Sequence, residues 1–160
     1  MLRVKDIMTK EVLTVTPETT VRDAATLLAK KGISGVPVVE GPKLVGIFSE
    51  SDILRSLSTV KKDIRMVYPS ISPLGIAFQE EVTQREILEA YGEAGRRPVG
   101  DVMTKSVITV DPEATVNDAI LLMRDRSINR LPVLDKGVLV GIVTRGDIIK
   151  GLAQDRSIGK

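Results

Sequence analysis

The stretch Asp6-Ile7-Met8-Thr9-Lys10 near the start of the chain returns as Asp101-Val102-Met103-Thr104-Lys105, a shift of 95 residues. The same shift relates Leu44-Val45-Gly46-Ile47 to Leu139-Val140-Gly141-Ile142. Roughly two dozen of about fifty aligned positions are identical without a gap, which is far more than chance similarity produces. The chain therefore contains two copies of one structural unit.

The composition of the chain restricts its possible functions. Among 160 residues there is no cysteine and no histidine, which excludes disulfides, thiolate or imidazole metal sites, and nucleophilic catalysis by Cys/His or Ser/His pairs. With 42% hydrophobic and 28% charged residues, the composition is that of an ordinary globular protein. The formal net charge of +2 is far below the basic excess of a dedicated nucleic-acid binder.

The apolar runs are short. Val138–Val143, among the longest, is far below the roughly twenty residues needed to span a bilayer. The first residues, Met1-Leu2-Arg3-Val4-Lys5-Asp6, lack the apolar core of a signal peptide. We therefore expect no membrane insertion and a location in the reducing cytoplasm.

Each copy has the pattern of a mixed unit of strands and helices. The β-branched runs 12–15 and 107–110 predict short strands, each closed by a proline two residues later. Thr20 with Asp23, and Thr115 with Asp118, have the spacing of a helix-capping box. Behind each box apolar residues recur at helical spacing: Val21, Ala24, Ala25 and Leu28 in the first copy, and Val116, Ala119, Ile120 and Met123 in the second.

A hairpin and a second helix complete each copy. Tight turns at Gly41-Pro42 and Lys136-Gly137 separate apolar runs that predict paired strands. A last short helix is expected to begin near Ser51 and near Gly146. The order strand, helix, strand, strand, helix is an α/β (α+β) unit. Because one unit of about fifty-five residues buries too little surface to be stable alone, we expect the two copies to pack face to face about a pseudo-two-fold axis.

The order of short motifs in both copies resembles the CBS domain, named after cystathionine β-synthase. Four segments occur twice: an Asp-x-Met-Thr opening, a strand followed by proline, an x-Pro-Val-hydrophobic-acidic strand, and Gly-hydrophobic-x-[Ser/Thr]-x-x-Asp before the final helix. The resemblance covers about 100 residues. It implies tandem βαββα repeats at 1–56 and 99–160 that pair through their sheets, with an inter-repeat segment at 57–98.

The resemblance implies a regulatory chain that is not an enzyme and has no catalytic cofactor. Family members accept an adenosine-containing ligand in the cleft between their copies: AMP, ADP, ATP or an S-adenosylmethionine-type molecule. The aspartate of the [Ser/Thr]-x-x-Asp motif binds the ribose diol in this family, and an ionised carboxylate can accept both hydroxyl protons. A helix start beside it favours phosphate. The matching residues are Ser49 and Asp52 in the first copy, and Thr144 and Asp147 in the second.

The same spacing has a purely structural explanation. Ser49 with Asp52, and Thr144 with Asp147, also match a helix-capping box, which needs no ligand. The two roles are compatible, because Thr144 can cap the helix while Asp147 points into the cleft.

Recognition of the base is implied at the strand entry after the Met-Thr opening and around the x-Pro-Val strand. Backbone groups dominate there in the family, together with apolar side chains. Without the resemblance, the aliphatic positions among them would be described as core. The matching positions are Thr14, Val15, Ile33 and Val36 in the first copy, and Thr109, Val110, Ile128 and Leu131 in the second.

The two copies differ where the resemblance implies a phosphate. The second copy has Arg130 where the first has Gly35, and it has Arg145 where the first has Glu50. Both arginines resemble phosphate-contacting residues in the γ subunit of AMP-activated protein kinase, although both are also consistent with solvated surface charge. Glu50 would repel an anion. We expect a first-copy site that is weaker or suited to a ligand without phosphate, and one phosphate-bearing site with Asp147, Thr144, Arg145 and Arg130.

The segment 57–98 has no counterpart after the second copy and holds three of the four aromatic residues: Tyr68, Phe78 and Tyr91. Two prolines and a glycine in 68–75 exclude a regular helix, which predicts a loop or an extended strap. Thr83 with Glu86 predicts a helix that follows it. We expect this segment to contribute contacts to a homodimer; the alternative is a cover over the edge of one monomer.

Two functions fit these patterns. In the first, an adenosine ligand shifts the orientation of the copies, and a separate effector protein reads the change in trans. In the second, the chain is a constitutive dimerisation or scaffold module with degenerate clefts. Nucleic-acid binding is not favoured, because the basic pairs are short and stacking aromatics are scarce. Catalysis is disfavoured too, because Asp52 and Asp147 are copies of one binding position and not an acid/base pair.

Overall fold

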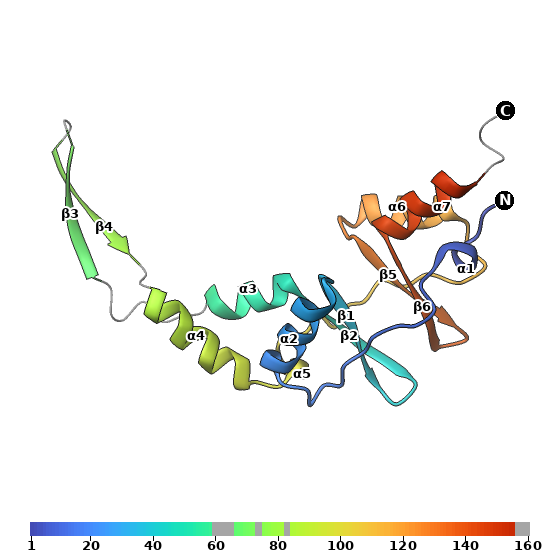
Figure 1. The fold of residues 1–160 in the computed structure, drawn as a ribbon, viewed down its shortest axis with the longest axis horizontal. Coiled ribbons are helices and arrows are strands. Elements are labelled where there is room, and N and C mark those ends of the chain that lie inside the picture. The colour runs from blue at the N-terminus through green and yellow to red at the C-terminus, as the bar shows by residue number, and fades with distance from the viewer. Residues whose placement is uncertain (59–65, 73–74, 82–83, 156–160) are drawn as a thin grey trace.

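Two β-hairpins, one in each copy of the repeat, form the framework of the fold (Figure 1). The computed structural model describes residues 1–58, 66–72, 75–81 and 84–155. In it β1 (Gly35–Glu40) pairs antiparallel with β2 (Lys43–Ser49), and β5 (Arg130–Asp135) pairs antiparallel with β6 (Val138–Thr144). Both predicted turns are confirmed. Lys136 and Gly137 have positive φ angles of 50° and 81°, as a two-residue hairpin turn of the right twist requires.

The four helices predicted in the two repeats are present. α2 (Val21–Lys31) and α6 (Val116–Asp125) begin at the expected caps, where the hydroxyls of Thr20 and Thr115 each accept a hydrogen bond at 3.1 Å from the amide three residues later. α3 (Glu50–Ser58) and α7 (Arg145–Gln154) follow the hairpins. The apolar stripes of α2 and α6 lie in the cores, with these residues buried: Val21, Ala24, Leu28, Val116, Ala119 and Met123.

The predicted first strand of each copy is reduced to a single parallel bridge. Val15 donates to the carbonyl of Pro37 at 3.1 Å and accepts from the amide of Val39 at 2.9 Å, and Val110 pairs in the same way with the second hairpin. The prediction of a strand over 12–15 and 107–110 is therefore wrong in extent. A turn follows at once after Val15, so that one residue alone reaches the sheet.

The opening segment of each copy packs on the other copy, which the sequence did not indicate. Two short helices, α1 (Val4–Ile7) and α5 (Val99–Val102), begin these segments. Val4 belongs to the buried cluster of the second copy, and Val99 belongs to that of the first. Thr9 bridges to Ile142, and Thr104 bridges to Ile47. A shift of 95 residues interchanges these two contacts, which confirms that the copies are related by a pseudo-two-fold axis.

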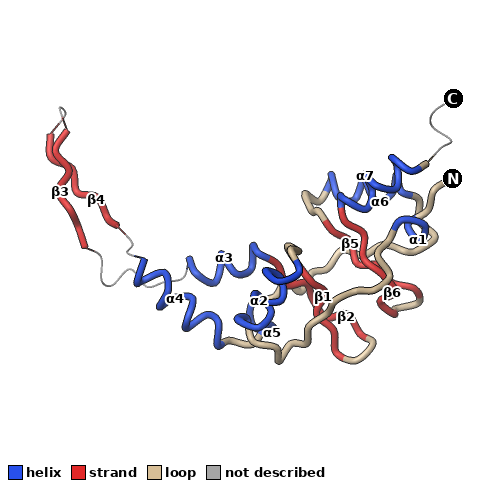
Figure 2. The backbone as a smooth tube through the Cα atoms, viewed as in Figure 1, coloured by secondary structure: helices blue, strands red, loops and turns tan. Residues whose placement is uncertain are grey.

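The inter-repeat segment forms a separate hairpin and a helix. β3 (Met66–Ser72) pairs with β4 (Gly75–Glu81) and stands away from the two repeats, at the opposite end of the molecule from the chain termini (Figure 2). The expected loop or strap is therefore extended but paired, since proline is tolerated in a strand that lies at an edge. The predicted helix is α4 (Gln84–Arg96), which contacts α2 and α3. Thr83, its predicted cap, lies outside the described residues.

None of the described helices combines the length and the apolar character that a bilayer crossing requires.

Candidate functional site

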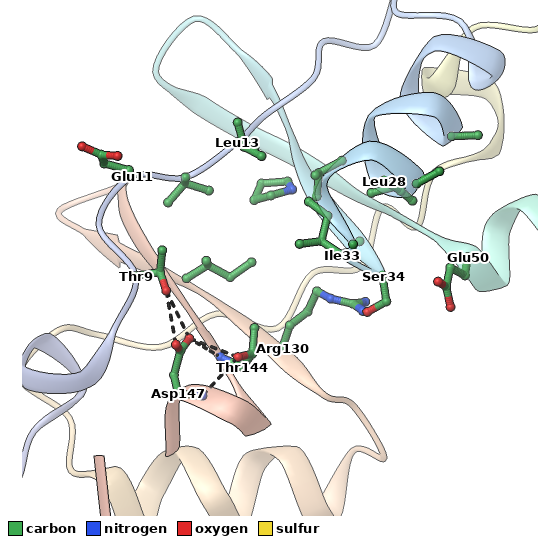
Figure 3. A pocket seen from close by; sticks show the side chains of 18 of the residues that line it. Thr9, Glu11, Leu13, Leu28, Ile33, Ser34, Glu50, Arg130, Thr144 and Asp147 are labelled. Carbon is green, nitrogen blue, oxygen red and sulfur yellow. Dashed lines mark hydrogen bonds between the residues drawn. The ribbon is translucent and has the colours of Figure 1, made fainter. Parts of the chain in front are cut away.

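Two clefts lie between the copies, and each is lined by residues of both. The larger has a volume of about 800 Å³ and the smaller about 270 Å³, against roughly 300–1,000 Å³ for small-molecule sites. The larger cleft combines the Thr-x-x-Asp end of the second copy with the segments 11–13 and 32–37 of the first (Figure 3). The smaller cleft combines 49–51 of the first copy with 106–108 and 127–130 of the second. In each cleft, the expected ribose-binding motif therefore comes from one copy and the expected base-binding positions come from the other.

Asp147 caps a helix and faces the larger cleft at the same time. Its Oδ2 accepts hydrogen bonds from the amide and the hydroxyl of Thr144 at 2.9 and 3.1 Å, while the Thr144 hydroxyl accepts from the Asp147 amide at 3.3 Å. The carboxylate also accepts from the Thr9 hydroxyl, at 3.2 Å to Oδ1 (Figure 3). Asp147 is half-buried and lines the cleft. Because an ionised carboxylate offers about four acceptor positions, Oδ1 retains capacity for a ligand hydroxyl.

Asp52 occupies the equivalent position in the first copy but does not line the smaller cleft. Its side chain has no exposed surface. Oδ2 accepts from the amide and hydroxyl of Ser49 at 2.9 and 3.3 Å, and Oδ1 accepts from Thr104 at 3.0 Å and from Arg55 at 2.8 Å. These four donors satisfy the carboxylate. Arg55, whose counterpart is Lys150, was not among the predicted site residues.

Arg130 lies between the two clefts and lines both of them. It donates a hydrogen bond to the hydroxyl of Ser34 in the first copy. Its guanidinium covers Gly35, where an added Cβ would lie 2.7 Å from Cζ. Burial lowers the pKa of Arg130, while the negative charges of Glu50 and Asp52 act in the opposite direction. A guanidinium retains its proton in proteins under such shifts, so Arg130 is a cation at this position.

The structure does not bring Arg145 into either cleft. Its side chain is exposed at the start of α7. Several amides of this helix start also have acceptors already, since the Arg145 amide donates to the carbonyl of Asn129 at 3.3 Å and the Asp147 amide donates to Thr144. The helix start therefore offers less to a phosphate than the sequence suggested.

The predicted base-contacting positions divide into two groups. Ile33 and Val36 line the larger cleft and Ile128 lines the smaller one. Five positions line neither: Val15, Val110 and Leu131, which are buried in the cores, and Thr14 and Thr109. In their place stand residues one to three positions earlier, because the extended segment meets the sheet only at its end: Val12, Leu13, Val107 and Ile108.

Thr9 and Thr104 are functional candidates that were not among the residues predicted from the sequence. Each donates its hydroxyl hydrogen bond to the motif aspartate of the other copy. Their signal was present in the Met-Thr opening that occurs twice, but its partner could not be identified before the exchange of the opening segments was known.

The family of the chain follows from a comparison with known proteins. The family model "CBS domain" matches residues 4–59 and 99–154, and the chain belongs to this family. A protein of Methanocaldococcus jannaschii is 40% identical over 155 residues, which cover 95% of this chain and 92% of the relative. The structure of CBSX2 from Arabidopsis thaliana in complex with AMP has a TM-score of 0.70 and 30% identity, with coverage of 96% of this chain and 98% of that one.

One similar enzyme matches over a part of its length only. An inosine-5'-monophosphate dehydrogenase of Korarchaeum cryptofilum is 33% identical over 147 residues, which are 91% of this chain but 23% of that enzyme. The similarity thus concerns the CBS-domain part that the two proteins share.

Proposed function

We propose that this chain is a regulatory module, without catalytic activity, that binds an adenine nucleotide or a related adenosyl ligand in the larger cleft. The observation that carries the proposal is Asp147, a half-buried carboxylate with acceptor capacity directed into a cavity of about 800 Å³ between two CBS repeats. The AMP bound to CBSX2, a relative of 30% identity and the same fold, supports an adenosine-containing ligand.

Each part of such a ligand has a matching wall in the larger cleft. One hydroxyl of the ribose diol binds Oδ1 of Asp147, beside the hydroxyl of Thr9. The base lies against the apolar side chains of Ile33 and Val36. A phosphate reaches Arg130, whose planar guanidinium can make two parallel hydrogen bonds to it.

A binding experiment with one pair of variants tests this proposal. In Asp147→Asn the ribose loses a charged acceptor, so AMP affinity measured by calorimetry should fall by at least about tenfold. Asp118→Asn is the matched control, because Asp118 fills the same position in the capping box of α6 but lines neither cleft. Undiminished AMP binding by Asp147→Asn would contradict the proposed site.

We further propose that the chain acts as a cytoplasmic homodimer whose state is read by an effector protein in trans. Support comes from the end of the molecule that carries β3 and β4, because an isolated two-stranded hairpin is marginally stable in water. Large apolar side chains are exposed on the neighbouring helices: Leu54 at 66%, Ile87 at 49% and Leu88 at 62%. A second copy of the chain would cover both.

The alternative is a constitutive scaffold with degenerate clefts, for which the buried Asp52 is the supporting observation. A thermal-shift screen with AMP, ATP, S-adenosylmethionine and methylthioadenosine separates the two functions. A ligand that binds the native state raises its apparent stability, whereas a scaffold with degenerate clefts responds to none of the four.

A further inference from the structure

The two clefts are separated by a wall of few residues. Three side chains line both clefts, namely Ser34, Glu50 and Arg130, and we call them the shared wall. Among the described residues that line either cleft, Arg130 is the only cationic side chain. An anion in the larger cleft and an anion in the smaller one would therefore meet the same positive charge.

The single arginine in the shared wall follows from the symmetry of the repeat. Positions 35 and 130 are equivalent in the two copies, and they contact each other. Equivalent positions that touch lie at the pseudo-two-fold axis, where there is space for one long side chain. A Cβ on Gly35 would lie 2.7 Å from both Cζ and Nη1 of Arg130, so glycine at position 35 is what allows Arg130 to occupy the axis.

Glu50 gives the shared wall its second charge. Burial lowers the pKa of Arg130, and the negative charge of Glu50 acts in the opposite direction. Glu50 and the equivalent residue of the second copy, Arg145, are both exposed, but only Glu50 lines the clefts. The shared wall therefore carries one cation and one anion, so a phosphate in either cleft meets an attractive guanidinium and a repelling carboxylate.

We propose that Arg130 is a phosphate-binding residue shared by the two clefts, so that a phosphate-bearing ligand in one cleft weakens the binding of a second in the other. This inference rests on the proposed function, since it assumes that the clefts bind nucleotides. A guanidinium turned toward one phosphate in a bidentate pair is withdrawn from the opposite cleft. The second phosphate then meets Glu50 and the first phosphate, both negative. Adenosine carries no phosphate, so its binding in one cleft should not weaken the binding of a second adenosine in the other.

Calorimetry with AMP and adenosine on the full chain tests the proposal. For AMP, the second binding event should be at least about fivefold weaker than the first, or absent. Arg130→Gln should reduce the affinity for AMP at least about tenfold more than it reduces the affinity for adenosine. Arg126→Gln, which changes an exposed arginine outside both clefts, is the matched control.

A second variant adds the missing charge. Glu50→Arg gives the shared wall two cations, and the second AMP should then bind at least about threefold more tightly than it does in the unchanged protein. Two equal AMP sites in the unchanged protein, or a second AMP site that stays weak or absent in Glu50→Arg, would overturn the proposal. Thermal unfolding of each variant checks that it is folded.

The outcomes separate this inference from the proposed function. If neither AMP nor adenosine binds the unchanged protein, both are wrong. If both ligands bind but Arg130→Gln has no effect on the affinity for AMP, the proposed role of Arg130 is wrong, and the proposal of a nucleotide-binding module is unaffected.

Discussion

Single residues decide which of the two motif aspartates can serve a ligand. Asp52 and Asp147 are indistinguishable by motif, and the sequence predicted both as site residues. The difference lies in Arg55, which pairs with Asp52 at 2.8 Å, whereas the second copy has an exposed lysine at this position. A motif specifies which residues occur, but whether the carboxylate is sealed depends on neighbours that only the packed structure identifies.

The two arginines that the sequence treated alike should behave differently. Arg130 lines both clefts, and Arg145 is exposed outside them. Because an exposed charge is screened by water, Arg145→Gln should leave AMP affinity within about twofold, measured by calorimetry beside Arg130→Gln. A loss in Arg145→Gln as large as that in Arg130→Gln would place the phosphate elsewhere.

A glycine in each hairpin is required by close packing. A Cβ on Gly141 would lie 2.6 Å from Sδ of Met8 and 3.1 Å from the carbonyl oxygen of Thr9. Gly141→Ala should therefore lower the free energy of unfolding by about 1–3 kcal/mol in urea denaturation. Gly146→Ala is the control, since its nearest neighbour would be 3.6 Å away. Equal stability of the two variants would show that Met8 and Thr9 can move away from an added methyl group at no cost in free energy.

Elements were predictable where local patterns determine them. The capping boxes, the stripes of α2 and α6 and both hairpin turns depend on residues close together in the chain. The exchanged position of α1 and α5 was not predictable, because no pattern along the chain shows that Val4 is buried in the core of the second copy. The lining of the clefts was partly missed for the same reason, since it combines segments from different copies.

The exchange of opening segments makes α1 part of the second core. Val4 has no exposed surface, so Val4→Ala removes two buried methyl groups and should cost about 2 kcal/mol of unfolding free energy. Hydrogen exchange should show the loss of protection first in β5 and β6. Val138→Ala, at an exposed position, serves as the control. Faster exchange in β1 and β2 instead would contradict the assignment of Val4 to the second copy.

At the scale of the whole molecule, the projecting hairpin and the two repeats should be separable in function. Replacing residues 66–81 with a short Gly-Ser linker removes β3 and β4 and leaves every cleft-lining residue in place. Light scattering should show the proposed dimer for the full chain and a monomer for this variant, and calorimetry should give unchanged AMP affinity. If light scattering instead shows that the variant is still a dimer, the dimer contact lies on another surface.

The exchanged openings also bear on how the chain is synthesised. Val99 completes the core of the first repeat, yet it follows that repeat by some forty residues. When the first repeat has left the ribosome, its core therefore still lacks Val99 and the rest of α5. Folding of the N-terminal half must wait for translation of the C-terminal half to begin, so the two repeats become native together and not in succession.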